Sequence, residues 1–235
     1  MEPHQILEAI LWFVAFLFST TVHEAGHAWV ALLGGDRTAY LGGQVSLSPL
    51  PHVRREPIGM VLVPLITSFT QGWPIGWASA PYDPLWADRH PRRAVWMAAA
   101  GPAGNFCIAV SSFLFLKAGL AWGYFVAPQR IGFSHLVAPG VHGDLAGFLA
   151  QGLSMFLTLN LLLGTFNLIP LPPLDGAAVL GVILPEEKAR AARRLAGSPQ
   201  MSLIGLVVAW QLFPKVVVPL FHLLIRLLHP GVVYS

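Results

Sequence analysis

The chain carries very little charge. Asp, Glu, Lys and Arg make up 11% of its 235 residues, whereas a soluble globular domain has about 25%. It also has only 1 cysteine, which excludes an internal disulfide and hence a disulfide-stabilised scaffold. Hydrophobic residues account for 55% of the chain and the mean hydropathy is +0.63. These values exclude an ordinary soluble enzyme and a disordered chain, and they indicate a polytopic membrane protein.

Four apolar segments are long enough to cross about 30 Å of hydrocarbon as helices. They cover residues 6–33, 94–126, 146–166 and 201–228. No basic residue precedes the first segment, so we expect a retained membrane helix and not a cleaved secretory signal. Pro214 and Pro219 are the expected kink points of the last segment.

The stretch between the first two spans combines three patterns. Residues 44–48 alternate polar and apolar side chains after a glycine pair, which predicts a strand or a hairpin arm. Residues 58–69 are apolar, but the segment is short and is interrupted by Gly59 and Pro64, so it is either a fifth span or a re-entrant segment. Residues 78–84 are rich in proline and are expected to be extended.

The positions of the basic residues favour the re-entrant alternative. If residues 58–69 do not cross, 10 of the 14 lysines and arginines fall on one side of the membrane. They are Arg37, Arg54, Arg55, Arg89, Arg92, Arg93, Lys188, Arg190, Arg193 and Arg194. The positive-inside rule assigns that side to the cytoplasm and the N-terminus to the outside. The last four residues belong to a predicted surface helix over 185–197, which opens with proline and acidic residues and closes with arginines and glycine.

A charged motif lies inside the first span. His23, Glu24 and His27 form an H-E-x-x-H pattern, and residues four apart share one face of a helix. Both imidazoles can therefore bind one metal ion, and the glutamate can act as a general base. A charged group inside a membrane helix costs about 2.5–3.5 kcal/mol and usually marks a functional site. A buried hydrogen-bonded cluster and the proton relay of a transporter are the alternatives.

A catalytic zinc site also needs a third protein ligand and an open position. Asp175 is the candidate, because it follows a proline-rich stretch that must end the third helix. Non-helical backbone at membrane depth is tolerated only where it is buried in protein or lines a cavity. An ordinary loop, with Asp175 as a helix cap, is the alternative.

Three motifs, in this order, resemble the site-2 protease family of intramembrane zinc metalloproteases. They are His23-Glu24-x-x-His27, Gly101-Pro102-Ala103-Gly104-Asn105 and Asn167-x-x-Pro170-x-Pro172-x-x-Asp175-Gly176. The resemblance covers roughly residues 20–180 and implies an all-α polytopic membrane protein. The expected protein has about four transmembrane helices, a short or re-entrant apolar segment and a small β-strand element after the first helix. Residues 76–81 depart from the Lys-Pro-Val-Pro-like stretch of many small relatives, which affects the expected strand contacts.

The resemblance also implies a domain organisation. No PDZ insertion or CBS domain is visible, so we expect a small family member. A single metalloprotease domain is expected over residues 1–235, with its core over about 6–180 and a C-terminal helix over about 201–228.

The same resemblance implies roles for individual residues. His23, His27 and Asp175 would bind Zn²⁺, Glu24 would be the catalytic base, and Asn167 would help to hold the substrate carbonyl. Asn105 is expected near the site, either as a substrate-binding residue or as a helix-packing amide. An unwound substrate segment could pair with the strand predicted over 44–48.

The implied partners are the lipid bilayer and membrane proteins with a single transmembrane segment, such as anti-sigma factors or signal-peptide remnants. No nucleic-acid partner is expected, since the basic residues lie in short loops. We expect a multi-pass protein of a prokaryotic cell membrane with its active site toward the cytoplasm. A membrane transporter and a catalytically silent homologue that binds membrane partners are the alternative functions.

Overall fold

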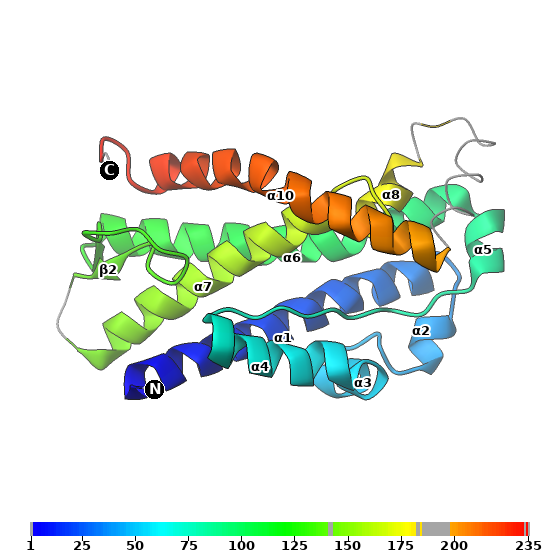
Figure 1. Ribbon diagram of the computed structural model, residues 1–235, viewed down its shortest axis with the longest axis horizontal. Coiled ribbons are helices and arrows are strands. Elements are labelled where there is room, and N and C mark those ends of the chain that lie inside the picture. Colours follow the sequence, from blue (N-terminus) through cyan, green and yellow to red (C-terminus); the bar gives the residue numbers. More distant parts are fainter. Residues whose placement is uncertain (1, 141–142, 182–183, 185–197, 233, 235) are drawn as a thin grey trace.

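The computed structural model describes residues 2–140, 143–181, 184, 198–232 and 234. Within this part of the chain, 4 helices are long and apolar enough to cross a membrane. They are α1 (Pro3–Leu33), α6 (Pro91–Ala121), α7 (Asp144–Asn167) and α10 (Pro199–Leu228). All four run along the length of the molecule, and both termini lie at one end (Figure 1). The predicted all-α polytopic membrane fold is confirmed.

Local sequence explains where these helices begin. Proline occupies the first turn of α1, α6 and α10, where its missing N–H costs no helical hydrogen bond. Ser198 precedes α10, and its hydroxyl accepts a hydrogen bond from the backbone N–H of Met201 at 3.2 Å. Figure 1 shows that α10 changes direction near its middle, as expected for a helix that contains Pro214 and Pro219.

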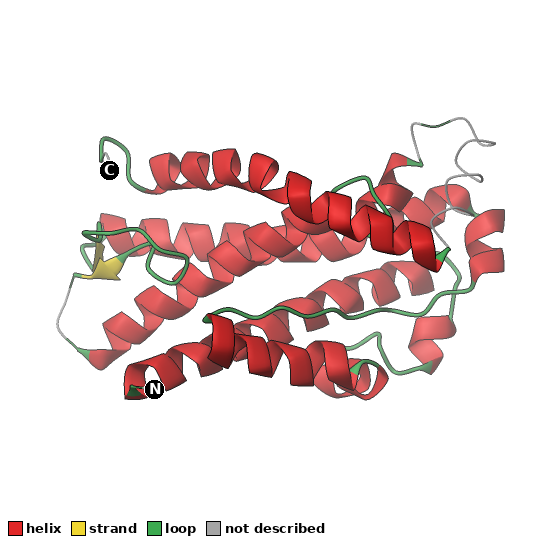
Figure 2. Cartoon of the chain, viewed as in Figure 1, coloured by secondary structure: helices red, strands yellow, loops and turns green. Residues whose placement is uncertain are grey.

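Shorter elements connect the four spans. The helical ones are α2 (Thr38–Leu41), α3 (Pro49–Arg55), the π-helical segment η1 (Ile58–Leu62), α4 (Val63–Gln71), α5 (Pro84–Arg89) and α8 (Asp175–Leu180). Two short strands, β1 (Phe125–Val126) and β2 (Ala138–Pro139), pair antiparallel with Phe125 opposite Pro139 (Figure 2). These strands lie between α6 and α7 and not in the stretch that follows the first helix.

The apolar segment after α3 is re-entrant. η1 and α4 run alongside α1, and an extended stretch then returns in the opposite direction to α5 (Figure 1). Gly72 makes the turn with φ +78°. The returning chain is held by hydrogen bonds from Trp77 N to Gly59 O (3.1 Å) and from Ile75 N to Thr67 Oγ1 (2.8 Å). This path, out along α1 and back, is the one expected of the re-entrant alternative for residues 58–69.

The prediction of a strand over residues 44–48 is wrong, because residues 45–47 form bends and residues 44 and 48 are irregular. Their alternation has a different cause. The buried Gln44 side chain donates to Ser79 O at 3.3 Å, Ser46 O accepts from His52 Nε2 at 3.0 Å, and the Ser48 side chain caps α3. The polar residues thus make tertiary and capping contacts and do not line one face of a sheet. The surface helix predicted over 185–197 lies outside the described residues.

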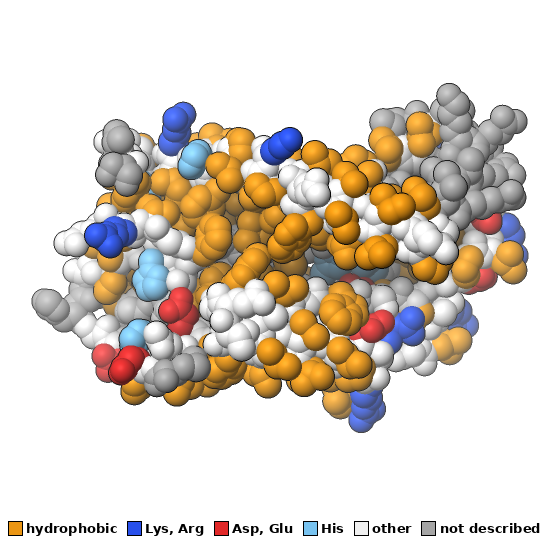
Figure 3. Space-filling view, viewed as in Figure 1, with side chains coloured by type: hydrophobic (Ala, Val, Ile, Leu, Met, Phe, Trp, Pro, Cys, Tyr) orange, Lys and Arg blue, Asp and Glu red, His pale blue; other side chains and the backbone are white. Residues whose placement is uncertain are grey.

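The core is formed where α1, α6 and α7 cross. Small residues allow the close approach that helix packing in lipid requires. A Cβ atom on Gly26 would lie 2.8 Å from Ala100 O, so α1 and α6 could not keep this distance with any larger residue at that point. Hydrophobic side chains cover much of the outer surface, as expected for contact with lipid (Figure 3).

Candidate metal centre

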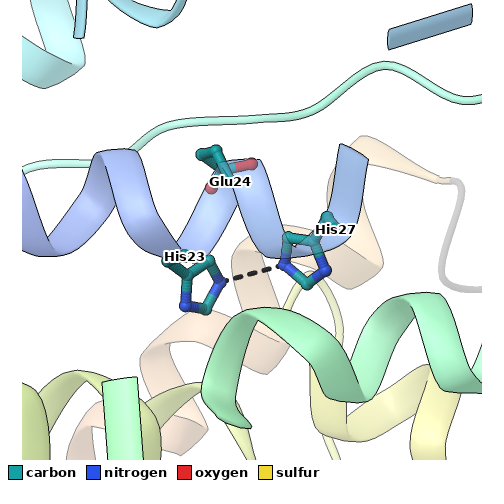
Figure 4. Close-up of side chains that lie close together, drawn as sticks. All are labelled: His23, Glu24 and His27. Carbon is teal, nitrogen blue, oxygen red and sulfur yellow. Dashed lines mark hydrogen bonds between the residues drawn. The ribbon is translucent and has the colours of Figure 1, made fainter. Parts of the chain in front are cut away.

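The H-E-x-x-H motif lies on α1 within the core. His23, Glu24 and His27 are all buried, and one ligand atom from each lies within 4.8 Å of the others. Both imidazoles project from the same side of the helix, and Glu24 projects from the other side (Figure 4). The Nε2 atoms of His23 and His27 are 3.0 Å apart. The four-residue spacing therefore places both rings at one point, as predicted.

Each imidazole is fixed through its other nitrogen. His27 Nδ1 lies 2.7 Å from Met97 O, and a carbonyl oxygen only accepts, so Nδ1 carries the proton. His23 Nδ1 donates in the same way to Asn105 Oδ1 at 2.6 Å. In the neutral rings both Nε2 atoms then present lone pairs to each other. Two facing lone pairs at this distance repel unless a cation lies between them, and this favours a metal site.

Asp175 supplies a third donor from a distant part of the chain. It begins α8, directly after the proline-rich stretch that follows α7. Its Oδ2 atom is 3.1 Å from His23 Nε2 and 3.4 Å from His27 Nε2. Donors on one tetrahedral zinc ion are about 3.3 Å apart at normal Zn–N distances, and two imidazoles with one carboxylate are a set found in catalytic zinc sites. The three residues therefore fit zinc in both chemistry and spacing.

Gly101 on α6 lies in close contact with the two imidazoles. A Cβ atom at this position would collide with His27 Nε2 and would lie 2.6 Å from His23 Nε2. The absence of a side chain at Gly101 thus allows the α6 backbone to pack directly against both imidazoles.

The two asparagines named by the motifs lie in different surroundings. Asn167 is the last residue of α7, and its amide donates to Leu163 O of the same helix at 3.0 Å. Asn105 is fully buried behind His23, and its Nδ2 donates to Asn160 Oδ1 at 2.8 Å and to Ser19 O at 3.4 Å. The sequence motifs did not indicate Asn160 or Ser19, because neither belongs to a pattern with ligand spacing.

The metal centre opens toward one face of the molecule. Figure 3 shows a hollow on this face between α10 and α4, with histidine and acidic side chains on its floor. Asp175 has 21% of its side chain exposed, more than either histidine. Asp175 is therefore the donor that solvent reaches most readily.

Comparisons with known proteins agree with this geometry. The sequence profile of Peptidase family M50 matches residues 11–209. The relative named "Putative zinc metalloprotease YwhC" from Bacillus subtilis is 33% identical over 173 residues, which is 73% of this chain and 68% of the relative. The relative named "Putative zinc metalloprotease Rip2" from Mycobacterium tuberculosis is 29% identical over 200 residues, 85% of this chain and 66% of the relative. No solved structure matches the chain at a significant level.

The family match, together with apolar helices around a buried His–Glu–His cluster, identifies an intramembrane zinc metalloprotease. The chain belongs to peptidase family M50. It is a multi-pass membrane protein that uses Zn²⁺, and its family acts on membrane proteins within the bilayer.

Proposed function

We propose that His23, His27 and Asp175 bind the zinc ion and that Glu24 is the general base for peptide hydrolysis in or near transmembrane segments. The observation that carries this proposal is the convergence of two imidazole nitrogens and one carboxylate oxygen within 3.4 Å of one another. Glu24, one residue from His23 on the same helix, has a ligand atom within 4.8 Å of those of both imidazoles.

Zinc, when bound, supplies a Lewis acid that lowers the pKa of a coordinated water toward about 7. The Glu24 carboxylate accepts a proton from the attacking water and returns it to the leaving nitrogen. Asn167 donates its amide N–H to the substrate carbonyl oxygen, in exchange for its bond to Leu163 O. Asp175 and the two histidines hold their donor atoms in place throughout.

The substrate must be extended where it is cleaved, because a helix hides its peptide bonds in internal hydrogen bonds. The returning stretch of the re-entrant segment, residues 74–83, is extended and supports a role in β-pairing with an unwound substrate. It replaces the strand that was predicted over 44–48. Suitable substrates are membrane proteins with a single transmembrane segment, such as anti-sigma factors or signal-peptide remnants.

The active site is proposed to face the cytoplasm of a prokaryotic cell. This orientation is supported by Arg37, Arg54 and Arg89, which belong to the loops and short helices at the end opposite the two chain termini. The catalytic unit is proposed to be one domain over residues 1–235. In support, Gly205 of α10 packs directly against the Pro172 backbone of the loop that leads to Asp175.

The decisive experiment compares metal content with proteolysis in the purified chain. The wild type should hold about one zinc ion per chain, and His23→Ala, His27→Ala and Asp175→Ala should each lower occupancy. Glu24→Gln should retain zinc and lose cleavage, since it removes a base and not a ligand. Membrane fragments that accumulate with wild type and not with Glu24→Gln would identify the substrates. Full zinc retention in Asp175→Ala would remove Asp175 from the ligand set.

A further inference from the structure

A chain of polar side chains leads from the metal centre into the core. Ser19 on α1, Asn105 on α6 and Asn160 on α7 are each 0% exposed. Asn105 Oδ1 accepts from His23 Nδ1 at 2.6 Å, and Asn105 Nδ2 donates to Asn160 Oδ1 at 2.8 Å. Asn160 Nδ2 donates to Ser19 Oγ and to Phe156 O, both at 2.8 Å. Three helices therefore meet at one hydrogen-bonded group.

Two backbone carbonyls fix the direction of every bond in this chain. Phe156 O can only accept, so the Asn160 amino group must face it and the Asn160 carbonyl must face Asn105. The Asn105 amino group then donates to Asn160 and to Ser19 O, which leaves the Asn105 carbonyl facing His23. His23 Nδ1 must carry the proton, and the lone pair of Nε2 is left for a metal ion.

Such a group is costly to retain in an apolar interior. An amide buried without partners loses the hydrogen bonds that water would give, and an apolar side chain of similar size avoids this cost. Here each amide nitrogen and each amide oxygen has a partner. A metal-bound histidine almost always has such a partner on its second nitrogen, and removal of that partner typically costs about 10–100-fold in metal affinity.

We propose that Asn160 is a positioning residue of the metal centre, although it touches neither metal nor substrate. It orients the Asn105 amide, and Asn105 in turn holds His23 in the tautomer and ring position that bind zinc. Asn105 is thereby assigned to His23 and not to the substrate. This proposal rests on the proposed ligand set, in which His23 binds the metal through Nε2.

The test is a zinc dissociation constant measured on the full chain in detergent micelles, by competition with a chelator of known affinity. Asn105→Leu should weaken zinc binding by about 10–100-fold, and Asn160→Leu by about 10-fold. The double variant should bind zinc no more weakly than Asn105→Leu alone, because Asn160 acts only through Asn105. Additive losses in the double variant would overturn the proposal, since two independent packing defects would add.

Two further variants complete the design. Thr158→Val is the matched control, because Thr158 is equally buried on α7 and its hydroxyl has no hydrogen-bond partner among the described residues. It should leave zinc affinity unchanged. Asn160→Asp has the same size, and in this apolar interior its carboxyl is expected to be protonated, so it keeps an acceptor for Asn105 and an O–H donor for Phe156 O. It should bind zinc nearly as the wild type does, which also covers the case in which Asn160→Leu does not fold. An Asn160→Asp protein that folds and binds zinc as weakly as Asn105→Leu would count against the proposal.

The variant His23→Ala distinguishes a failure of the proposed role of Asn160 from a failure of the proposed ligand set. Loss of zinc in His23→Ala together with wild-type affinity in Asn160→Leu would overturn the role of Asn160 and leave the ligand set intact. Wild-type affinity in His23→Ala would instead overturn the ligand set itself.

Discussion

At the residue scale, the metal centre depends on a missing side chain as much as on those present. Gly101 faces both imidazoles, so Gly101→Ala would push the ring nitrogens away from their common point. A displacement of about 1 Å can cost about 100-fold in rate, and we expect a loss of this size together with reduced zinc content. Zinc analysis and a cleavage assay on the purified variant check this.

The control for that variant is Gly104→Ala, one turn further along α6. A Cβ atom there would meet only Val22, with 3.3 Å to its Cγ1 atom. Alanine also has the higher helix propensity, by about 1 kcal/mol, so neither variant should destabilise α6 itself. If Gly101→Ala kept full zinc content and activity, the close contact between Gly101 and the imidazoles would not matter for the metal centre.

Sequence reasoning reached the two histidines through their spacing, and it reached Asp175 through its place after the prolines together with the family resemblance. His23 and His27 must share a helix face, and the prolines before Asp175 must end α7 near that point. Asn160 gives no such signal, because one asparagine in an apolar run is equally compatible with a packing role. Its function depends on which residues of α1 and α6 lie opposite, and this is a property of the packed structure.

At the element scale, the end of α1 is tied to α5 by a single carboxylate. Asp36 Oδ1 accepts from Thr38 N (2.9 Å) and Thr38 Oγ1 (2.6 Å), and Oδ2 accepts from Asp83 N (2.8 Å). Burial by itself raises the pKa of the Asp36 carboxyl, but these three hydrogen bonds outweigh it and lower the pKa below its ordinary value. The ionised carboxylate therefore stabilises this connection.

The lowered pKa predicts how stability depends on pH. An Asp with a depressed pKa in the folded state contributes stability above its unfolded pKa of about 3.9, and the contribution is lost as pH falls through the folded value. Asp36→Asn should cost about 1 kcal/mol near neutral pH, because the amide oxygen replaces only one of the two acceptors. Apparent Tm values of wild type and variant, measured in micelles from pH 7 downward, should converge below about pH 4. A constant difference down to pH 3 would exclude the role of the charge.

The long elements were predictable to within a few residues, and the short ones were not. Apolar length and first-turn prolines defined the four spans, although the second ends at Ala121 and not near residue 126. The strands β1 and β2 are only 2 residues each, too short to leave a periodic pattern. Gln44 gave a false pattern because its partner, Ser79, is 35 positions away.

At the scale of the whole molecule, the re-entrant segment decides the topology. Residues 58–71 run along α1 and the chain then returns, so α3 and α5 lie toward the same end of the molecule (Figure 1), and we predict that both are on the same side of the membrane. In a Cys107→Ser background, Arg54→Cys and Arg89→Cys should both resist a membrane-impermeant thiol reagent in intact cells. Both should react after permeabilisation.

The control belongs at the opposite end of the bundle. Gln129 is exposed in the connection between α6 and α7, so Gln129→Cys should react in intact cells. Reaction of only one of positions 54 and 89 from outside would mean that the segment crosses. Reaction of both positions from outside, with protection of position 129, would mean that the whole protein has the opposite orientation in the membrane.

The separation of the proposed ligands along the chain also has a consequence for the timing of biosynthesis. His23 and Asp175 are 152 positions apart. At about 5–20 residues per second, the ribosome needs roughly 8–30 s after it has made the histidines to reach the aspartate. Throughout that interval the nascent chain holds a glutamate and two imidazoles without their third partner. If Asp175 is the third ligand, we expect that the growing polypeptide cannot cut neighbouring proteins at the translocation site before its third span has been made.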